Sequence, residues 1–118
     1  MENERRMQIG VMGSAQDLNY GKRIEEILAK EYAQILFRYQ NPKLGSATTD
    51  MFSTPNGVET KLMEESFEVT KASMGKEGSR RQIEEIADVF YAITAYMVRD
   101  GLTFQDIAYE MSKRQGGG

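Results

Sequence analysis

The sequence predicts an all-α protein, a four-helix bundle whose core is completed by dimerisation. Apolar residues recur at helical spacing in four segments of the 118-residue chain. The connections between these segments are short, as they are in helix bundles. The third segment is apolar around most of its circumference, and a helix of that kind is buried on more than one side. A chain of this size would achieve that burial by pairing with a second copy.

The first helix is expected between about Tyr20 and Gln40. Asn41 and Pro42 end it, because the residue before a proline is disfavoured in the α region. A polar loop over residues 41–53 is expected to follow. The apolar stripe of this helix consists of Ile24, Ile27, Leu28, Ile35, Leu36 and Tyr39.

Glycine and proline mark the bounds of the next two helices. Thr54 and Pro55 are expected to begin the second helix, since proline suits the first turn, and the segment 75–78 ends it. Residues 79–82, Ser-Arg-Arg-Gln, fit a capping box that begins the third helix. Gly101 is the expected stop of that helix.

The two ends of the chain are predicted to differ from the helical centre. Thr103 caps a last short helix that ends near Arg114. The glycine tail, residues 116–118, is not expected to hold a structure. Residues 1–20 are predicted to form a separate arm, and the apolar, glycine-containing segment 7–14 suggests a short strand within it.

Composition excludes several classes of function. The chain has no cysteine and no histidine, so thiol and imidazole chemistry are absent and a metal would be bound by oxygen ligands, as magnesium, manganese and calcium are. A net charge of −3 argues against nucleic acid as a partner. No apolar run is long enough to span a membrane. A cytoplasmic location is expected.

Two pairs of acidic residues lie in stripes that should face the core. On a helical wheel, Glu65 and Glu68 share an arc with apolar residues of the second helix, and Glu85 and Asp88 do so on the third. Burying one ionised carboxylate costs several kcal/mol unless its charge is compensated. Two facing helices could bring all four acids to one point, where a divalent cation such as Mg²⁺ would compensate them.

A different interpretation of the same acids remains open. The glutamates could be solvated, or could form ion pairs with Lys61, Arg80 and Arg81 on the same helices. The chain would then be a helical interaction module without enzymatic activity, in which the acids are structural.

The spacing of the acids resembles a known family signature. Glu64, Glu65 and Glu68, followed by Glu85 and Asp88, match the pattern Glu-Glu-x-x-Glu … Glu-x-x-Asp of the all-α nucleoside triphosphate pyrophosphohydrolases. The resemblance covers roughly residues 30–115 and implies an all-α pyrophosphohydrolase domain over 21–115.

A loop narrows the resemblance to one branch. Residues 41–48, Asn-Pro-Lys-Leu-Gly-Ser-Ala-Thr, are similar to the Asn-Pro-x-x-Gly-Ser-x-Thr loop of the phosphoribosyl-ATP pyrophosphohydrolases of histidine biosynthesis. Two features depart from that branch: the interval from Gly57 to Glu64 is shorter, and Ala92 stands where many members have histidine. A MazG-like house-cleaning pyrophosphohydrolase acting on noncanonical nucleotides therefore stays open as an alternative.

The resemblance implies a hydrolase that cleaves phosphoribosyl-ATP to phosphoribosyl-AMP and pyrophosphate with Mg²⁺, or Mn²⁺, as its cofactor. Self-association as a homodimer or tetramer is expected from the apolar third helix. The metal ligands would be Glu65, Glu68, Glu85 and Asp88. The catalytic residues would be Glu64, Glu65, Glu68 and Lys61. The substrate would be bound by Gly45, Ser46, Thr48, Lys61 and Arg114.

The N-terminal arm has a weak resemblance of its own. Residues 9–17 are similar to the opening strand and glycine turn of Rossmann-like proteins of the lysine-decarboxylase-like family. Such a turn can bind phosphate at a helix N-terminus. The rest of the chain offers no further strand–helix units, so an appended arm is the expectation.

Overall fold

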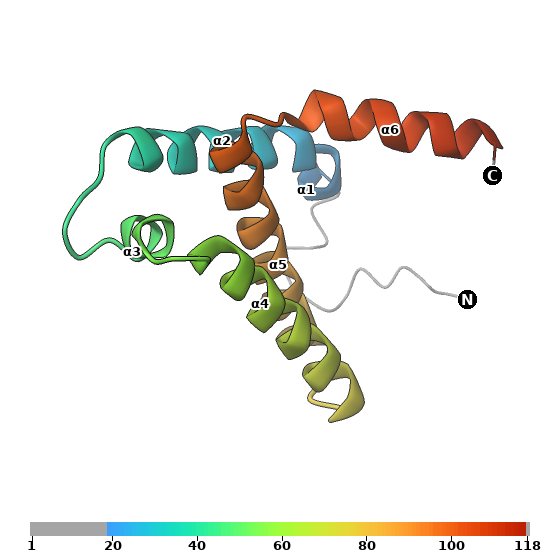
Figure 1. The fold of residues 1–118 in the computed structure, drawn as a ribbon. Helices are drawn as coiled ribbons and strands as arrows, with labels where there is room; N and C mark the ends of the chain where they lie inside the picture. The colour runs from blue at the N-terminus through green and yellow to red at the C-terminus, as the bar shows by residue number, and fades with distance from the viewer. Residues whose placement is uncertain (1–18, 118) are drawn as a thin grey trace.

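The computed structural model describes residues 19–117, which contain six helices and no strand (Figure 1). The all-α prediction is confirmed. The predicted strand at 7–14 and the resemblance at 9–17 lie outside the described residues. The helices are α1 (Asn19–Lys22), α2 (Ile24–Gln40), α3 (Ala47–Ser53), α4 (Gly57–Met74), α5 (Ser79–Asp100) and α6 (Phe104–Gly117).

The helices α4 and α5 pack against each other along their length and form the scaffold of the molecule (Figure 1). The helix α2 crosses α5, and the short α3 fills the corner between α2 and α4. Burial of apolar side chains from all four elements holds this arrangement together. The core consists of Ile35, Met51, Val58, Ala95 and Val98.

Two predicted helix boundaries, the end of α5 and the start of α6, are confirmed by their capping bonds. The backbone N–H of Gly101, at a φ of 71°, donates to carbonyls of the last turn of α5, which is the left-handed stop that glycine favours. Thr103 and Asp106 form a reciprocal cap for α6: Thr103 N–H donates to Asp106 Oδ2 at 2.8 Å, and Asp106 N–H donates to Thr103 Oγ1 at 3.3 Å. Both signals are local, so the sequence is sufficient to find them.

The prediction of a plain loop over residues 41–53 is wrong, because α3 lies inside it. The hydroxyl oxygen of Ser46 caps α3 by accepting from Thr49 N–H at 3.2 Å. A helix of seven residues spans about two turns, which is too short to show a periodic apolar stripe. The polar composition therefore concealed it.

One predicted helix start is displaced, and one predicted cap is not formed. The helix α4 begins at Gly57 rather than at Thr54 and Pro55, since Asn56 adopts a left-handed φ of 57° that separates α4 from α3. The helix α5 begins at Ser79, but Gly78 occupies the N-cap position and no side chain caps the first turn. The expected capping box at 79–82 is therefore not formed.

The last helix, α6, runs away from the rest of the chain (Figure 1). It is anchored at its start, where the ring of Phe104 meets that of Tyr32 edge-on at 5.9 Å. The bundle within one chain therefore consists of α2, α4 and α5, and α6 lies outside it. Gly116 and Gly117 continue α6, so the expectation that the glycine tail holds no structure is wrong for these two residues.

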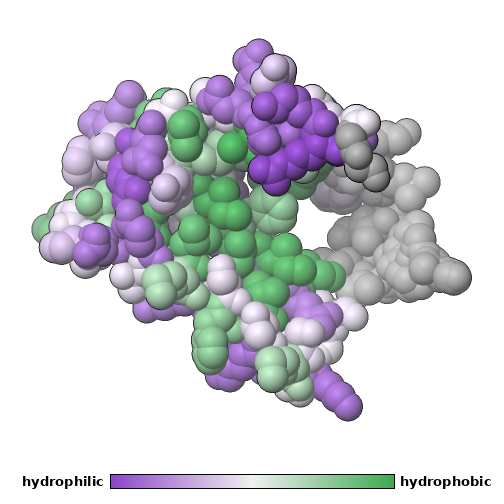
Figure 2. All heavy atoms as spheres, turned by 45° about the vertical axis from the view of Figure 1, so that its right-hand side comes forward, coloured by the Kyte–Doolittle hydropathy of each residue, from purple (hydrophilic) through white to green (hydrophobic). Residues whose placement is uncertain are grey.

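A large apolar surface remains exposed on this scaffold (Figure 2). The third predicted helix, α5, buries only one face within the chain, and Ile86, Phe90 and Ile93 on its other face are 40–45% exposed. Ile107, Tyr109 and Met111 of α6 are exposed as well. Among residues 19–117, no helix is long and apolar enough to cross a membrane.

Candidate metal centre and adjoining pocket

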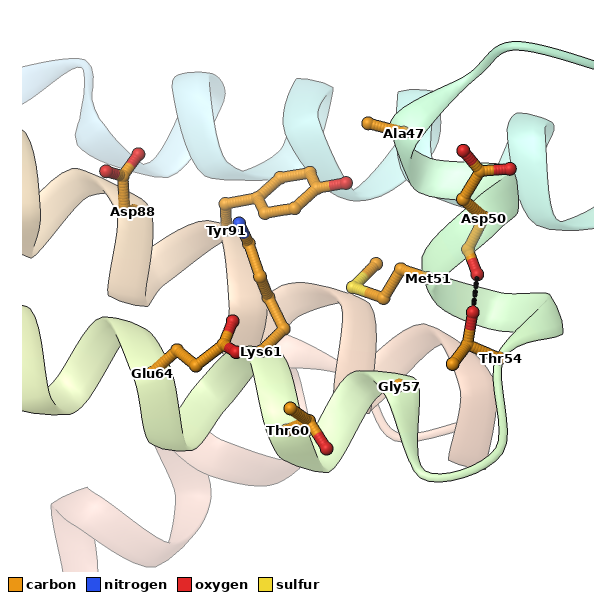
Figure 3. A pocket seen from close by; sticks show the side chains of 10 residues that line it. All are labelled: Ala47, Asp50, Met51, Thr54, Gly57, Thr60, Lys61, Glu64, Asp88 and Tyr91. Carbon is orange, nitrogen blue, oxygen red and sulfur yellow. Dashed lines mark hydrogen bonds between the residues drawn. The ribbon is translucent and has the colours of Figure 1, made fainter.

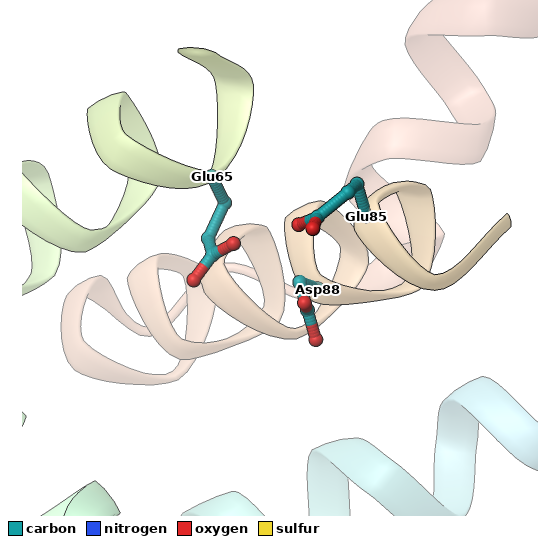
Figure 4. Close-up of side chains that lie close together, drawn as sticks. All are labelled: Glu65, Glu85 and Asp88. Carbon is teal, nitrogen blue, oxygen red and sulfur yellow. The ribbon is translucent and has the colours of Figure 1, made fainter. Parts of the chain in front are cut away.

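Three carboxylates from two helices meet where α4 and α5 face each other (Figure 4). Glu65 comes from α4, while Glu85 and Asp88 come from α5. One carboxylate oxygen from each lies within 4.8 Å of the others. The spacing of three residues places Glu85 and Asp88 on one face of α5, and packing of α4 against that face brings Glu65 to them.

Two of the three acids are removed from water. Glu85 is 3% exposed, and its Oε2 accepts an ion-pair contact from Arg81 Nη2 at 2.5 Å. The side chain of Glu65 is 12% exposed and pairs with Lys61 Nζ at 2.8 Å. Asp88 is exposed and forms no ion pair with the described basic residues. The three bases of the structural interpretation all form ion pairs: Lys61 with Glu65, Arg81 with Glu85, and Arg80 with Glu84 outside the cluster. Of the three clustered acids, these pairs leave Asp88 uncompensated.

Electrostatic crowding at the cluster affects the protonation of Glu85. Burial raises the pKa of Glu85, and the negative charges of Asp88, Glu65 and Glu68 raise it further, while Arg81 opposes them. The hydrogen bond to Glu65 raises the pKa of Lys61. The cluster therefore carries more negative charge than its own bases neutralise, which is the condition that favours binding of a cation.

The fourth predicted ligand, Glu68, is not among the three acids that meet. It is half-buried on α4, one turn after Glu65, and its charge reaches Glu85. Three of the four predicted carboxylates therefore meet. The fourth, Glu68, lies close enough to raise the pKa of Glu85.

A pocket of about 440 Å³ adjoins the acidic cluster (Figure 3). Asp88 belongs to both, and Lys61 lines the pocket while pairing with Glu65 of the cluster. The remaining walls come from α3, from the turn before α4, from α4 and from α5. The lining residues are Ala47, Asp50, Met51, Thr54, Gly57, Thr60, Lys61, Glu64, Asp88 and Tyr91.

The three residues of the loop that were predicted to bind substrate, Gly45, Ser46 and Thr48, do not line the pocket. The Ser46 hydroxyl caps α3, and Gly45 adopts a left-handed φ of 87° in the preceding turn. Both residues therefore shape the backbone of this segment. The hydroxyl of Thr48 lies 2.6 Å from that of Tyr91. Ala47, which the motif leaves unspecified, is the residue of this segment that lines the pocket.

The predicted substrate residue Arg114 does not reach this pocket within the chain. It lies near the end of α6, its side chain is 77% exposed, and its guanidinium pairs with Glu110 of the same helix at 3.1 Å. Sequence reasoning also missed Tyr91 and Asp50 as pocket residues. A signal existed for Tyr91, because it follows Asp88 by three residues and so shares its face of α5.

The family model and the curated relatives that match this chain agree on one family. Residues 29–115 match the family described as phosphoribosyl-ATP pyrophosphohydrolase. A protein of Limosilactobacillus fermentum named phosphoribosyl-ATP pyrophosphatase is 36% identical over 86 residues, which are 72% of this chain and 80% of that relative. A relative of the same name from Saccharolobus islandicus is 35% identical over 91 residues, covering 76% and 96% of the two chains. Another, from Sulfolobus acidocaldarius, is 32% identical over 91 residues, covering 76% and 95%. No solved structure matches the chain significantly.

Proposed function

Because the chain belongs to the phosphoribosyl-ATP pyrophosphohydrolase family, we propose that it hydrolyses phosphoribosyl-ATP to phosphoribosyl-AMP and pyrophosphate, a reaction of histidine biosynthesis. The single observation that carries the site assignment is the meeting of three carboxylates from two helices at the edge of a pocket. The family membership supports the reaction, and the geometry supports where the chain performs it.

The donor set of the acidic cluster fits a hard divalent cation. Mg²⁺ and Mn²⁺ prefer carboxylate oxygens, and two ligand oxygens on one Mg²⁺ lie roughly 3 to 4 Å apart, given metal–oxygen distances near 2.1 Å. The oxygens of Glu65, Glu85 and Asp88, which lie within 4.8 Å of one another, need only small side-chain movements to meet this requirement. We propose that these three hold the cation and that Glu68 supports them as a fourth acid.

The bound cation would neutralise phosphate oxygens and make the phosphorus more electrophilic. We propose that water attacks the phosphorus directly, since hydrolysis adds water oxygen and the chain has no cysteine or histidine that could attack first. Glu64 lines the pocket one turn of α4 from Lys61, and we propose that it orients this water and accepts its proton. Lys61 holds Glu65 in place at 2.8 Å and provides a positive charge for the phosphates. Water oxygen bonds to phosphorus while the phosphoanhydride bond breaks, and pyrophosphate leaves.

A panel of nucleotides tests this proposal. We expect pyrophosphate release from phosphoribosyl-ATP in the presence of Mg²⁺ and none in EDTA, with kcat/KM at least about 100-fold above that for ATP or deaminated triphosphates. ATP and the deaminated triphosphates lack the second ribosyl phosphate of phosphoribosyl-ATP. A ratio of about 100-fold corresponds to about 2.7 kcal/mol of binding between the enzyme and that group in the transition state. Preferential hydrolysis of a deaminated triphosphate would assign the chain to the house-cleaning activity instead. Absence of hydrolysis across the whole panel would contradict both.

We propose in addition that the chain self-associates through its exposed apolar surface. Exposed apolar side chains gather on the free face of α5 and along α6, and an apolar area of this kind marks an interface. Arg114 could serve a substrate only in such an assembly, where α6 lies against a second copy. We expect sedimentation equilibrium to give at least twice the mass of 13.4 kDa, and Phe90→Asp to reduce it to one chain. A wild-type protein of monomer mass at micromolar concentration would refute the proposal.

A further inference from the structure

A contact between the hydroxyl groups of Tyr91 and Thr48 joins α5, which provides Glu85 and Asp88, to the end of the predicted substrate loop over residues 41–48. Thr48 lies in the first turn of α3, Tyr91 lies in the middle of α5, and their oxygens are 2.6 Å apart although 43 positions separate them in the chain. Both side chains are partly buried, and the Tyr91 ring packs against the hydrophobic core. The position of the phenol oxygen is therefore fixed both by the hydrogen bond to Thr48 and by the packing of the ring.

Tyr91 also faces the pocket, one helical turn after Asp88. Both residues line the same cavity, together with Lys61. Figure 3 shows the Tyr91 hydroxyl directed toward the α3 side, where Ala47 and Asp50 line the pocket. A group bound beside the acidic cluster would thus have Asp88 on one side and the Tyr91 hydroxyl within the same cavity.

The pair holds one more hydrogen than its mutual bond needs. Two hydroxyls carry two hydrogens, and either oxygen can be the donor in the bond between them. Phenol is the more acidic hydroxyl and hence the better donor to an anionic oxygen. An anion in the pocket therefore favours the arrangement in which Thr48 donates to Tyr91 and Tyr91 donates to the anion. The two bonds then polarise each other and strengthen together.

We propose that Tyr91 binds a phosphate oxygen of the substrate and that Thr48 acts only through it, as the residue that orients the phenol. This inference rests on the proposed function and alters the substrate contacts that the family resemblance implied, because Thr48 then makes no substrate contact of its own. It also explains why a threonine of the loop turns its hydroxyl toward α5 rather than toward the cavity.

A double-mutant cycle tests the relay, with the variants Tyr91→Phe, Thr48→Val and their combination. Each substitution removes one hydroxyl and nearly keeps the shape. We expect Tyr91→Phe to lower kcat/KM for phosphoribosyl-ATP by about 10- to 100-fold, the range for a hydrogen bond to a charged group. The loss should appear mainly in KM, as it does when binding is lost equally in ground and transition states. Thr48→Val should cost about 3- to 10-fold alone and less than 2-fold in the Tyr91→Phe background.

Tyr32→Phe is the matched control, because the Tyr32 hydroxyl donates to the carbonyl of Leu102 at 2.7 Å and does not line the pocket. It should lower the melting temperature without a change in KM. A purely structural Tyr91 would behave in the same way, and that result would overturn the inference. Additive losses for Thr48→Val and Tyr91→Phe would overturn it too, since Thr48 would then contact the substrate independently.

The wild-type rate separates this inference from the proposed function. Failure of the wild type to release pyrophosphate from phosphoribosyl-ATP would contradict the proposed function, and the cycle would then be measured on whichever nucleotide of the panel is hydrolysed. A wild type that hydrolyses phosphoribosyl-ATP, alongside a Tyr91→Phe variant of unchanged KM, would contradict the relay alone.

Discussion

Asp88→Asn should reduce kcat by at least about 100-fold and abolish most of the stabilisation by Mg²⁺. Asp88 belongs to both the acidic cluster and the pocket. Loss of residues that merely support metal ligands costs about 10- to 100-fold, so loss of a ligand should cost more. In the wild type, a cation at a hundredfold excess over its dissociation constant adds about 2.7 kcal/mol to the free energy of unfolding. Steady-state kinetics and thermal melts with and without Mg²⁺ measure the two effects.

Asp88 is the informative acid to replace because no described basic residue forms an ion pair with it. Replacing Glu65 would leave Lys61 without its ion-pair partner. Replacing Glu85 would remove the buried partner of Arg81, which also pairs with the more exposed Glu77 and Glu84. Asp88→Asn removes one mutually repelling charge, so in EDTA the variant should be as stable as the wild type or more stable. Glu25→Gln, on the exposed start of α2, is the control for a lost negative charge. A variant that melts well below the wild type in EDTA and still responds fully to Mg²⁺ would refute the metal site.

The same melts should depend on pH because the pKa of Glu85 is raised in the folded protein. A raised pKa means that ionising the group costs the folded state more than the unfolded state. Its contribution to stability is thus present below the ordinary glutamate range and is lost as the pH rises through the raised value. Mg²⁺ binds the ionised carboxylates, so the Mg²⁺-induced shift in melting temperature should be larger at pH 8 than at pH 5. A shift independent of pH would place the bound cation elsewhere.

Gly57→Ala should destabilise the protein by about 3 kcal/mol, lowering the melting temperature by about 10–20 °C. A Cβ atom at this position would overlap the carbonyl oxygen of Met51 and lie 3.1 Å from the Cβ of Thr54. The overlapped atom is backbone at the end of α3, so relief requires that α3 move away from α4. Because Met51 and Gly57 both line the pocket, KM should rise as well. Differential scanning calorimetry and initial rates would measure the two changes.

Gly21→Ala is the matched substitution for comparison. No described atom lies within 4 Å of a Cβ built at Gly21 in α1, so alanine there should be neutral or stabilise by up to about 1 kcal/mol through the unfolded state. Equal melting temperatures for the two alanine variants would show that the close approach of α3 and α4 at Gly57 is not tightly packed.

Local sequence patterns determined the helix faces that carry the acids and two of the helix boundaries. The acidic pairs Glu65 and Glu68, and Glu85 and Asp88, were assigned to helix faces by spacing alone, since a helix turns about 100° per residue. The stop at Gly101 and the cap at Thr103 were also predicted, because capping bonds join residues that are near neighbours in the chain. Each of these features depends on a few consecutive residues.

The tertiary structure alone decided which of these faces meet. The register between α4 and α5 brings Glu65 to Glu85 and Asp88 and leaves Glu68 beside them, a difference of one helical turn. The corner at Asn56 and Gly57 sets α3 against α4 and so shapes the pocket, while the bond from Thr48 to Tyr91 spans 43 positions. The spacing of residues along one helix follows from covalent geometry, but the register between two helices is set by how their side chains interlock. That packing involves the whole core, and no short segment of the sequence contains it.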